Sequence, residues 1–420
     1  MCAEACLKRI VGGVFVAVMA AGLSVTIGAQ APAGDTIYAC VNPAGLVRII
    51  PPRAACLGSE QPIHWNVTGP AGPQGLPGPA AASMYFLVEC AAGDKVNDAL
   101  EAGTDQSGRL FIEVRGTCQE SVYISRDDVI LYGHPDGGSL AAPSPDRNVL
   151  TIAGGQRISV NNLTLQDGSY GFLVHDGGGV QGRNLRITGN RTGLEIWDGT
   201  VRLSRTTIEA NTGNVTVGAG GRLYLSEQSA IRDADFQGAH TWGGVIDLND
   251  VTVSGNAGFG IGVMQARVRI ENSTITGNGR LGVWLHGGGV SIGHSRIADH
   301  TGHGVEVSAG TVDVSDTTIE SSGWSGIQAM MGSRIIVGGG NAFRANSQHG
   351  IWLKDTSVVS GFNPVGTQIT GNRRWGILCD PAPAVAQIGP HFSGTGFILN
   401  ATHVFGNTEG QISCPGILVP

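Results

Sequence analysis

The amino-acid sequence predicts an all-β protein built mainly as a right-handed parallel β-helix of three-strand coils, each about 22 residues long. Three observations predict it. A glycine followed by apolar, any and apolar residues recurs along the C-terminal part of the chain, more apolar residues follow each copy at fixed offsets, and an asparagine lies three or four residues before most copies. The apolar residues alternate with a period of two, which is typical of strands and not of helices.

Composition excludes several other classes. Glycine supplies 67 of the 420 residues and charged residues only 14%, whereas coiled coils and helical bundles are rich in charge and poor in glycine. A hydrophobic content of 41% is enough to bury a core, which argues against a disordered chain. The formal net charge of −7 argues against a nucleic-acid partner, because such proteins carry basic clusters.

The chain begins with a predicted export signal at residues 1–29. Lys8 and Arg9 precede an apolar run over residues 10–27, and small residues follow it, which is the layout of a secretory signal peptide. An anchoring helix is the alternative, but three glycines interrupt the run and its length is marginal. We therefore expect a secreted protein that is extracellular, periplasmic or at the cell surface, with no integral membrane span after cleavage.

Cysteine usage agrees with export. Six cysteines follow the signal, and an even number in an oxidising compartment predicts disulfides. Proximity in the sequence favours the pairs Cys40 and Cys56, Cys90 and Cys118, and Cys379 and Cys414. The chain has no Cys-x-x-Cys, so we expect no metal site and no cofactor. Ca²⁺ is the alternative left open, although no acidic cluster supports it.

Two short segments precede the repeats. Residues 30–68 form a small cysteine-containing module that needs its disulfide to fold. Residues 69–83 form a collagen-like linker, in which glycine stands at every third position from Gly69 to Gly78. Four triplets are too few to hold a trimer alone, so a stiff polyproline-like spacer is the simpler interpretation and a trimer is the alternative.

The repeats fill residues 84–420. The copies that begin at Gly260, Gly282, Gly304 and Gly326 are spaced by 22 residues, and a weaker copy begins at Gly238. Apolar residues eight, ten and fifteen positions after the glycine predict two further strands in each coil. Residues 93–100 read as a short amphipathic helix that caps the open edge of the first coil. The remaining clear copies begin at Gly171, Gly193, Asn214, Gly350 and Gly376.

This pattern resembles the bacterial secreted right-handed β-helix proteins of the pectin-lyase-like superfamily, over about residues 85–420. The resemblance implies that extended carbohydrate is bound on the outer wall of the helix. Residues two positions after the repeat glycine point outward, and in four successive coils they are Trp284, Glu306, Gln328 and Trp352.

Indole rings stack on sugar rings, and charged or amide groups bind hydroxyls. The predicted ligand-binding residues are therefore these four together with His286 and Lys354, which lie four positions after their glycines.

The sequence thus predicts a protein that binds a polysaccharide or cell-surface glycan, or that mediates surface interaction. The alternative is a polysaccharide-processing enzyme, either a lyase, a glycoside hydrolase or an epimerase. Its candidate catalytic residues are Glu306, His303 and Lys354. Hydrolysis needs two acids about 5–9.5 Å apart, and the sequence places no such pair on one wall. Whether the protein is an enzyme stays open at this point.

Overall fold

The computed structural model describes residues 36–66, 83–104, 108–362, 365–380 and 403–414. Contacts divide the chain into two compact units, Met1–Gly78 and Pro79–Pro420. The predicted signal peptide and nearly all of the collagen-like linker lie outside the described residues. No helix in the part of the chain that the structure describes is long and apolar enough to cross a membrane.

The first unit is a small antiparallel sheet. Its strands are β1 (Thr36–Val41), β2 (Val47–Ile50) and β3 (Gln61–Asn66), in the order β2-β1-β3. A disulfide joins Cys40 to Cys56, as sequence proximity predicts. On the face that carries the disulfide, Cys40 is fully buried and Ile50 nearly so, and Ala39 is buried at the centre of the opposite face.

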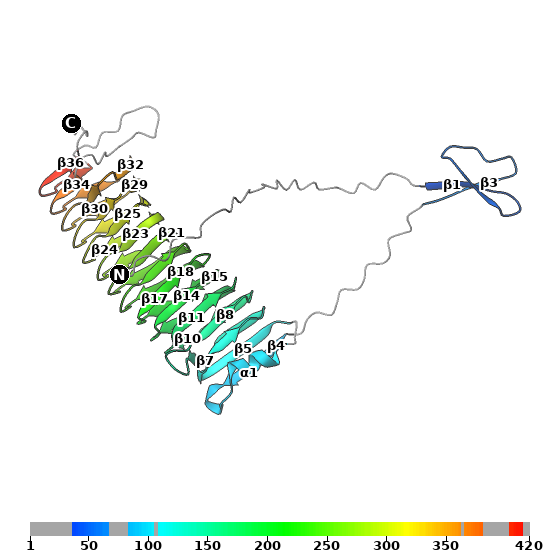
Figure 1. Cartoon of the computed structure of the whole chain (residues 1–420), viewed down its shortest axis with the longest axis horizontal. Coiled ribbons are helices and arrows are strands. Elements are labelled where there is room, and N and C mark those ends of the chain that lie inside the picture. The colour runs from blue at the N-terminus through cyan, green and yellow to red at the C-terminus, as the bar shows by residue number, and fades with distance from the viewer. Residues whose placement is uncertain (1–35, 67–82, 105–107, 363–364, 381–402, 415–420) are drawn as a thin grey trace, which may run out of the picture. The chain divides into compact units, whose positions relative to one another are not determined.

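The second unit is the predicted parallel β-helix, with about 13 turns stacked along one axis (Figure 1). Each coil contributes one segment to each of three parallel sheets, and equivalent segments of successive coils pair in register. In chain order the first sheet leads to the second, the second to the third, and a turn returns to the first sheet one coil further on.

The strands that belong to a single sheet are as follows. The first sheet contains β6 (Val122–Ile124), β8 (Leu150–Ala153), β11 (Tyr170–His175), β14 (Thr192–Ile196), β17 (Gly213–Val217), β19 (Ala239–Trp242), β25 (Val305–Ser308), β28 (Ile327–Met330), β31 (Ile351–Lys354), β34 (Trp375–Asp380) and β36 (Gly410–Ser413). The second contains β4 (Met84–Glu89), β9 (Ile158–Asn161), β12 (Gly179–Arg183), β15 (Thr200–Ser204), β26 (Thr311–Ser315), β29 (Arg334–Val337) and β32 (Val358–Phe362). The third contains β10 (Thr164–Gln166), β13 (Arg186–Thr188), β16 (Thr207–Glu209), β22 (Thr274–Thr276), β24 (Arg296–Ala298), β27 (Thr318–Glu320), β30 (Ala342–Arg344), β33 (Gln368–Thr370) and β35 (Val404–Phe405).

Six longer strands turn a corner and belong to two sheets, where the sequence predicts separate short strands. In β21 the chain bends at Gln265, whose φ is +48°, and pairing continues on both sides of the bend. The coils are otherwise as predicted, including the weaker copy at Gly238, which leads into β19. The six strands that turn a corner are β5 (Leu110–Gln119), β7 (Val129–Ala141), β18 (Arg222–Arg232), β20 (Val245–Ser254), β21 (Ile261–Glu271) and β23 (Val283–Gly293).

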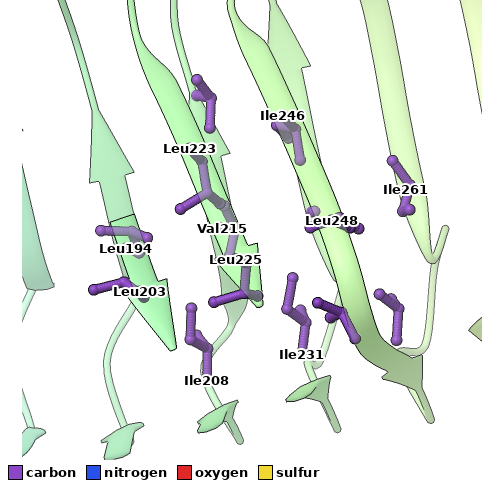
Figure 2. Close-up of a cluster of buried hydrophobic side chains, with 14 of the residues drawn as sticks. Leu194, Leu203, Ile208, Val215, Leu223, Leu225, Ile231, Ile246, Leu248 and Ile261 are labelled. Carbon is purple, nitrogen blue, oxygen red and sulfur yellow. The ribbon is translucent and has the colours of Figure 1, made fainter. Parts of the chain in front are cut away.

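The core runs along the inside of the helix. Residues one and three positions after the repeat glycine point inward, and pairs such as Val283 and Leu285 are fully buried. Figure 2 shows branched aliphatic side chains from successive coils stacked on one another. Burying each such side chain stabilises the fold by about 1.5–3 kcal/mol, and the next coil is what completes its burial.

A ladder of buried asparagines runs beside this core, at the turn that enters the first sheet. In each step, the backbone N–H and side-chain amide of one asparagine donate to the side-chain oxygen of the next: Asn256 donates to Asn278, and Asn346 to Asn372. The amide of Asn278 also donates to the carbonyl oxygen of Val253. Other residues take the place of asparagine in some coils, among them Ala234, His300 and Ser322.

The ladder asparagine does not itself adopt a left-handed backbone at this turn. The left-handed residue is the one before it, such as Gly255, Gly277 or Asp299, with φ of +66°, +61° and +61°. Asparagine is selected instead because it has both a donor and an acceptor to pass along the axis.

The N-terminal end of the β-helix is capped by a short helix as the sequence predicts, with one shift. The capping helix is α1 (Val96–Ala102), later than the predicted 93–100 because a 3-10 turn (η1, Cys90–Ala92) and Gly93 precede it. The Glu120 carboxylate accepts the first backbone N–H groups of α1, from Val96 and Asn97. The other two predicted disulfides, Cys90 to Cys118 and Cys379 to Cys414, join neighbouring coils at the two ends.

Replacing Asn278 by Ala should lower the free energy of unfolding by about 2–4 kcal/mol, because it removes the acceptor of the buried backbone N–H and side-chain amide of Asn256 and the donor to the carbonyl of Val253. Chemical denaturation followed by far-ultraviolet circular dichroism measures the change. Asn249 is the matched control, since it accepts a similar bond from Asn272 on the exposed surface. Asn249→Ala should change stability by less than about 0.5 kcal/mol; equal effects in both variants would contradict the role of the ladder.

Candidate functional site

The outer face of the first sheet, called the outer wall below, carries the predicted ladder in the predicted register. Trp284 pairs with Glu306, Glu306 with Gln328, and Gln328 with Trp352. At about 4.8 Å between strands, the two tryptophans lie about 14 Å apart along the axis. His286 pairs with Ser308 and Lys354 with Asp380, so both lie in the adjacent column four positions after the repeat glycine.

A second column of side chains, which the sequence analysis missed, lies at the turn two residues before the repeat glycine. The backbone N–H of Trp324 donates to the carbonyl of Gly302, and that of Gly302 to Arg280. These hydrogen bonds stack the turn residues in register, as the strands are stacked. The sequence does contain a signal for this column, because each of its members lies two residues before a repeat glycine. They include Phe236, Arg280, Trp324 and Arg374.

Where this turn column meets the ladder, the surface is hollowed into a cavity of about 300 Å³. Gly302 forms part of its lining, between Arg280 on one coil and Trp324 on another. A Cβ atom at Gly302 would lie 2.5 Å from the carbonyl oxygen of Arg280, so no larger residue fits there. The cavity is lined by Phe259, Arg280, Leu281, Trp284, Thr301, Gly302, Glu306 and Trp324.

Aromatic rings form two sides of the cavity. Phe259 stacks on Trp284, with ring centroids 5.2 Å apart and an interplanar angle of 15°, and the Arg280 guanidinium lies 5.1 Å from the Phe259 centroid. On the other side Trp324 is 49% exposed, so its ring is available to a ligand. The buried ring of His303 meets it edge to face at 5.0 Å and supports it from beneath.

The cavity contains one carboxylate, that of Glu306. Its burial raises the pKa above the ordinary glutamate value, while Arg280, Lys354 and a hydrogen bond from Trp284 act in the opposite direction. Glu306 can therefore accept hydrogen bonds from hydroxyl groups, or donate one when protonated. Glu306 is the only carboxylate among the residues that line the cavity, so the second acid that paired-acid hydrolysis requires is missing from this lining.

Three of the sequence-predicted site residues, His303, Gln328 and Trp352, are less exposed than expected. His303 is 1% exposed, its Nδ1 accepts the backbone N–H of Ser325, and burial lowers its pKa to about 4. Gln328 is only 5% exposed, although its position in the strand points outward. His303 therefore remains neutral near pH 7 and lies beneath the surface.

Trp352 is covered by neighbouring side chains. The Lys354 ammonium lies 4.4 Å from the centre of its ring, and His349 packs against it at 5.3 Å. Its indole nitrogen is buried and has no hydrogen-bond partner in the structure. The indole ring beside the cavity that is open to a ligand is therefore Trp324, at the turn, rather than Trp352.

A second acid and indole cluster lies on the same wall. The indole N–H of Trp197 donates to Glu195 at 2.6 Å, burial raises the pKa of Glu195, and Arg191 lowers it. Trp197 also contacts Trp242, with centroids 5.4 Å apart. Glu195 is five steps from Glu306 in the same ladder, or about 24 Å, so similar groups recur along the axis.

Two other hollows, each of about 390 Å³, lie on the outer face of the second sheet near its N-terminal end. Their charged residues are largely occupied by protein groups: Arg157 pairs with Asp127 and Asp128, and Arg202 stacks on Tyr224. Neither lining includes a carboxylate. The outer wall therefore offers a ligand more free functional groups than the face of the second sheet does.

One group in the described residues has ligand atoms close enough to hold a metal ion, namely Cys40, Cys56 and Glu60. Its two sulfur atoms are joined in a disulfide, and metal binding requires thiolates. The group therefore does not fit a metal ion. The sequence-based expectation that the chain has no metal site stays a prediction.

Comparison with known proteins agrees with the fold. Residues 237–381 match the family model described as the right handed beta helix region, which confirms the predicted resemblance to right-handed β-helix proteins. The curated proteins contain no match to this chain.

Similar solved structures include the A-module of a mannuronan C-5 epimerase from Azotobacter vinelandii, at 14% identity and a TM-score of 0.44 over 77% of this chain and 93% of that one. The Dettilon tailspike protein is 12% identical, with a TM-score of 0.48 over 68% of this chain and 64% of that one. An alginate lyase from Paenibacillus is 9% identical, with a TM-score of 0.32 over 71% and 97%. Similarities at this level do not indicate a shared function.

The stability of the protein should fall as the pH falls from about 6.5 toward 4. His300, His303 and His349 are buried, and burial lowers the pKa of each to about 4, whereas the unfolded chain takes up these protons near pH 6.5. Unfolding therefore consumes protons in this window, and each histidine lowers the unfolding free energy by up to about 1.4 kcal/mol per pH unit.

The variant His300→Asn isolates one of these groups. In the wild type, Nδ1 of His300 accepts the backbone N–H of Asn278 at a ladder position that most coils fill with asparagine, and the variant restores asparagine there. Denaturation at a series of pH values should show a slope that is smaller than that of the wild type by up to about 1.4 kcal/mol per pH unit, and little change at pH 7. An unchanged slope would show that the buried histidines do not govern the acid sensitivity.

Proposed function

We propose that this protein is a secreted β-helix protein that binds an extended polysaccharide along its outer wall. The observation that carries the proposal is the cavity in which Trp324 and the stacked pair Phe259 and Trp284 flank the charged groups of Arg280 and Glu306. Flat apolar rings pack against the faces of sugars, and fixed polar groups bind the hydroxyls.

The direction of the ligand follows from the arrangement of these residues. They come from different coils at equivalent positions, so the site extends along the helix axis. The Glu195, Trp197 and Trp242 cluster continues the same wall toward the N-terminus. A linear glycan that lies along the axis meets repeated acid and indole groups, which suits a repeating ligand better than a compact one.

Secretion is supported by the cysteines. Three disulfides form among the described residues, and such bonds persist in oxidising compartments. The predicted export signal at residues 1–29 agrees with them. We infer that the β-helix acts outside the cytoplasm, where polysaccharides and cell-surface glycans are its accessible partners.

A polysaccharide-processing enzyme is the second candidate, and the raised pKa of Glu306 favours it, because a protonated carboxyl group can act as a general acid. The candidate base His303 is buried and held as a hydrogen-bond acceptor by Ser325. Lys354, the other candidate, lies over the ring of Trp352. With no accessible base beside Glu306 among the cavity-lining residues, binding is the function that the geometry supports best.

Binding to a panel of neutral and uronate-containing polysaccharides, measured by isothermal titration calorimetry, tests the proposal. Trp324→Ala should weaken binding to the preferred glycan by about 1–3 kcal/mol, by analogy with aromatic stacking on other flat rings. Tyr123→Ala is the matched control, because Tyr123 is 55% exposed on the first strand of the same sheet and remote from the cavity. Equal binding by the wild type and the Trp324 variant would place the site elsewhere.

Glu306→Gln separates binding from catalysis. If the protein only binds, the variant should release no product from any glycan, and neither should the wild type, in assays of reducing ends and of unsaturated products. Product formation by the wild type that the variant loses, while glycan binding is retained, would establish the enzyme instead.

A further inference from the structure

The small N-terminal module has one sheet face that is apolar apart from Gln61 at its edge, and several of its large apolar side chains are exposed. Paired residues of an antiparallel sheet share a face, and Ala39 pairs with both Ile49 and Ile63. Ile49 is 69% exposed, although it is among the most hydrophobic residues of the module. This apolar face consists of Ile37, Ala39, Val41, Val47, Ile49, Ile63 and Trp65, with the uncharged Gln61 beside Val41 at its edge.

The opposite face of the same sheet has a different character. It carries the buried disulfide sulfur of Cys40, the buried Ile50, and the ion pair between Arg48 and Glu60. The module's disulfide and ion pair are therefore on that side. Soluble monomers rarely expose a contiguous apolar surface, and such a surface marks a site of association.

The chain itself points to the occupant of this face. Trp65 lies four residues before Gly69, where glycine at every third position begins and continues to Gly78. Such a run forms a triple helix only when three chains lie side by side, and four triplets cannot hold three chains together unaided. A folded segment that brings three chains together next to the run would supply what it lacks.

We propose that the apolar face is the interface through which three copies of this chain associate, so that their collagen-like runs meet as a triple helix. The face carries no charged side chain, so identical copies meet without repulsion. The proposal does not rest on glycan binding. Three β-helices on one stalk would bind a polysaccharide with an avidity that a single wall lacks.

The mass of the secreted full-length protein, measured by multi-angle light scattering with its disulfides intact, tests the proposal. The wild type should have three times the mass of one chain. Ile49→Glu places a charge in the apolar face and should give a single chain. His64→Glu is the matched control, because His64 is exposed and pairs with Tyr38 on the opposite face, and it should remain trimeric.

Mapping of the Cys40 to Cys56 disulfide in both variants shows that the module is folded. A wild type with the mass of one chain, as when the face packs on its own β-helix, would overturn the proposal, and so would a dimer. A trimer that survives Ile49→Glu would place the interface elsewhere.

Discussion

Neighbouring coils of the β-helix share their backbone hydrogen bonds along one axis, and the register of each coil is fixed by the one before it. Two buried features enforce that register. The inward pairs such as Val283 and Leu285 stack between coils, and the asparagine ladder passes hydrogen bonds from Asn256 to Asn278. A slip of one residue would turn every apolar side chain outward. The straight columns on the outer wall exist because such a slip is so costly.

The candidate site is a consequence of those columns. Trp284 and Glu306 are neighbours because their strands pair, and Arg280, Gly302 and Trp324 are neighbours because their turns pair. The site therefore needs no loop of its own, and a few unusual residues at repeat positions are enough. The coil that carries Gly302 also carries His300, at a position where most coils have asparagine. This departure from the repeat directly precedes Thr301, which lines the cavity.

Much of this arrangement could be predicted from the sequence. A period of 22 residues fixes which residues share a column, so the pairing of Trp284 with Glu306 follows from counting, and the disulfides follow from proximity. The exposure of each side chain does not follow, because it depends on packing between columns: Gln328 is buried, and Lys354 covers Trp352. The contribution of Arg280 and Trp324 was missed because outward columns were counted only at strand positions after the repeat glycine, and not at the turn before it.

The dependence of affinity on ligand length tests the central claim most directly. Oligosaccharides of increasing length, cut from the polysaccharide that binds best, would be titrated against the wild-type protein. Because similar acid and indole groups recur over the five steps from Glu195 to Glu306, about 24 Å, affinity should rise with each added sugar until the ligand spans that length and then level off. A single sugar that binds as tightly as the long oligosaccharides would contradict an extended site along the helix axis.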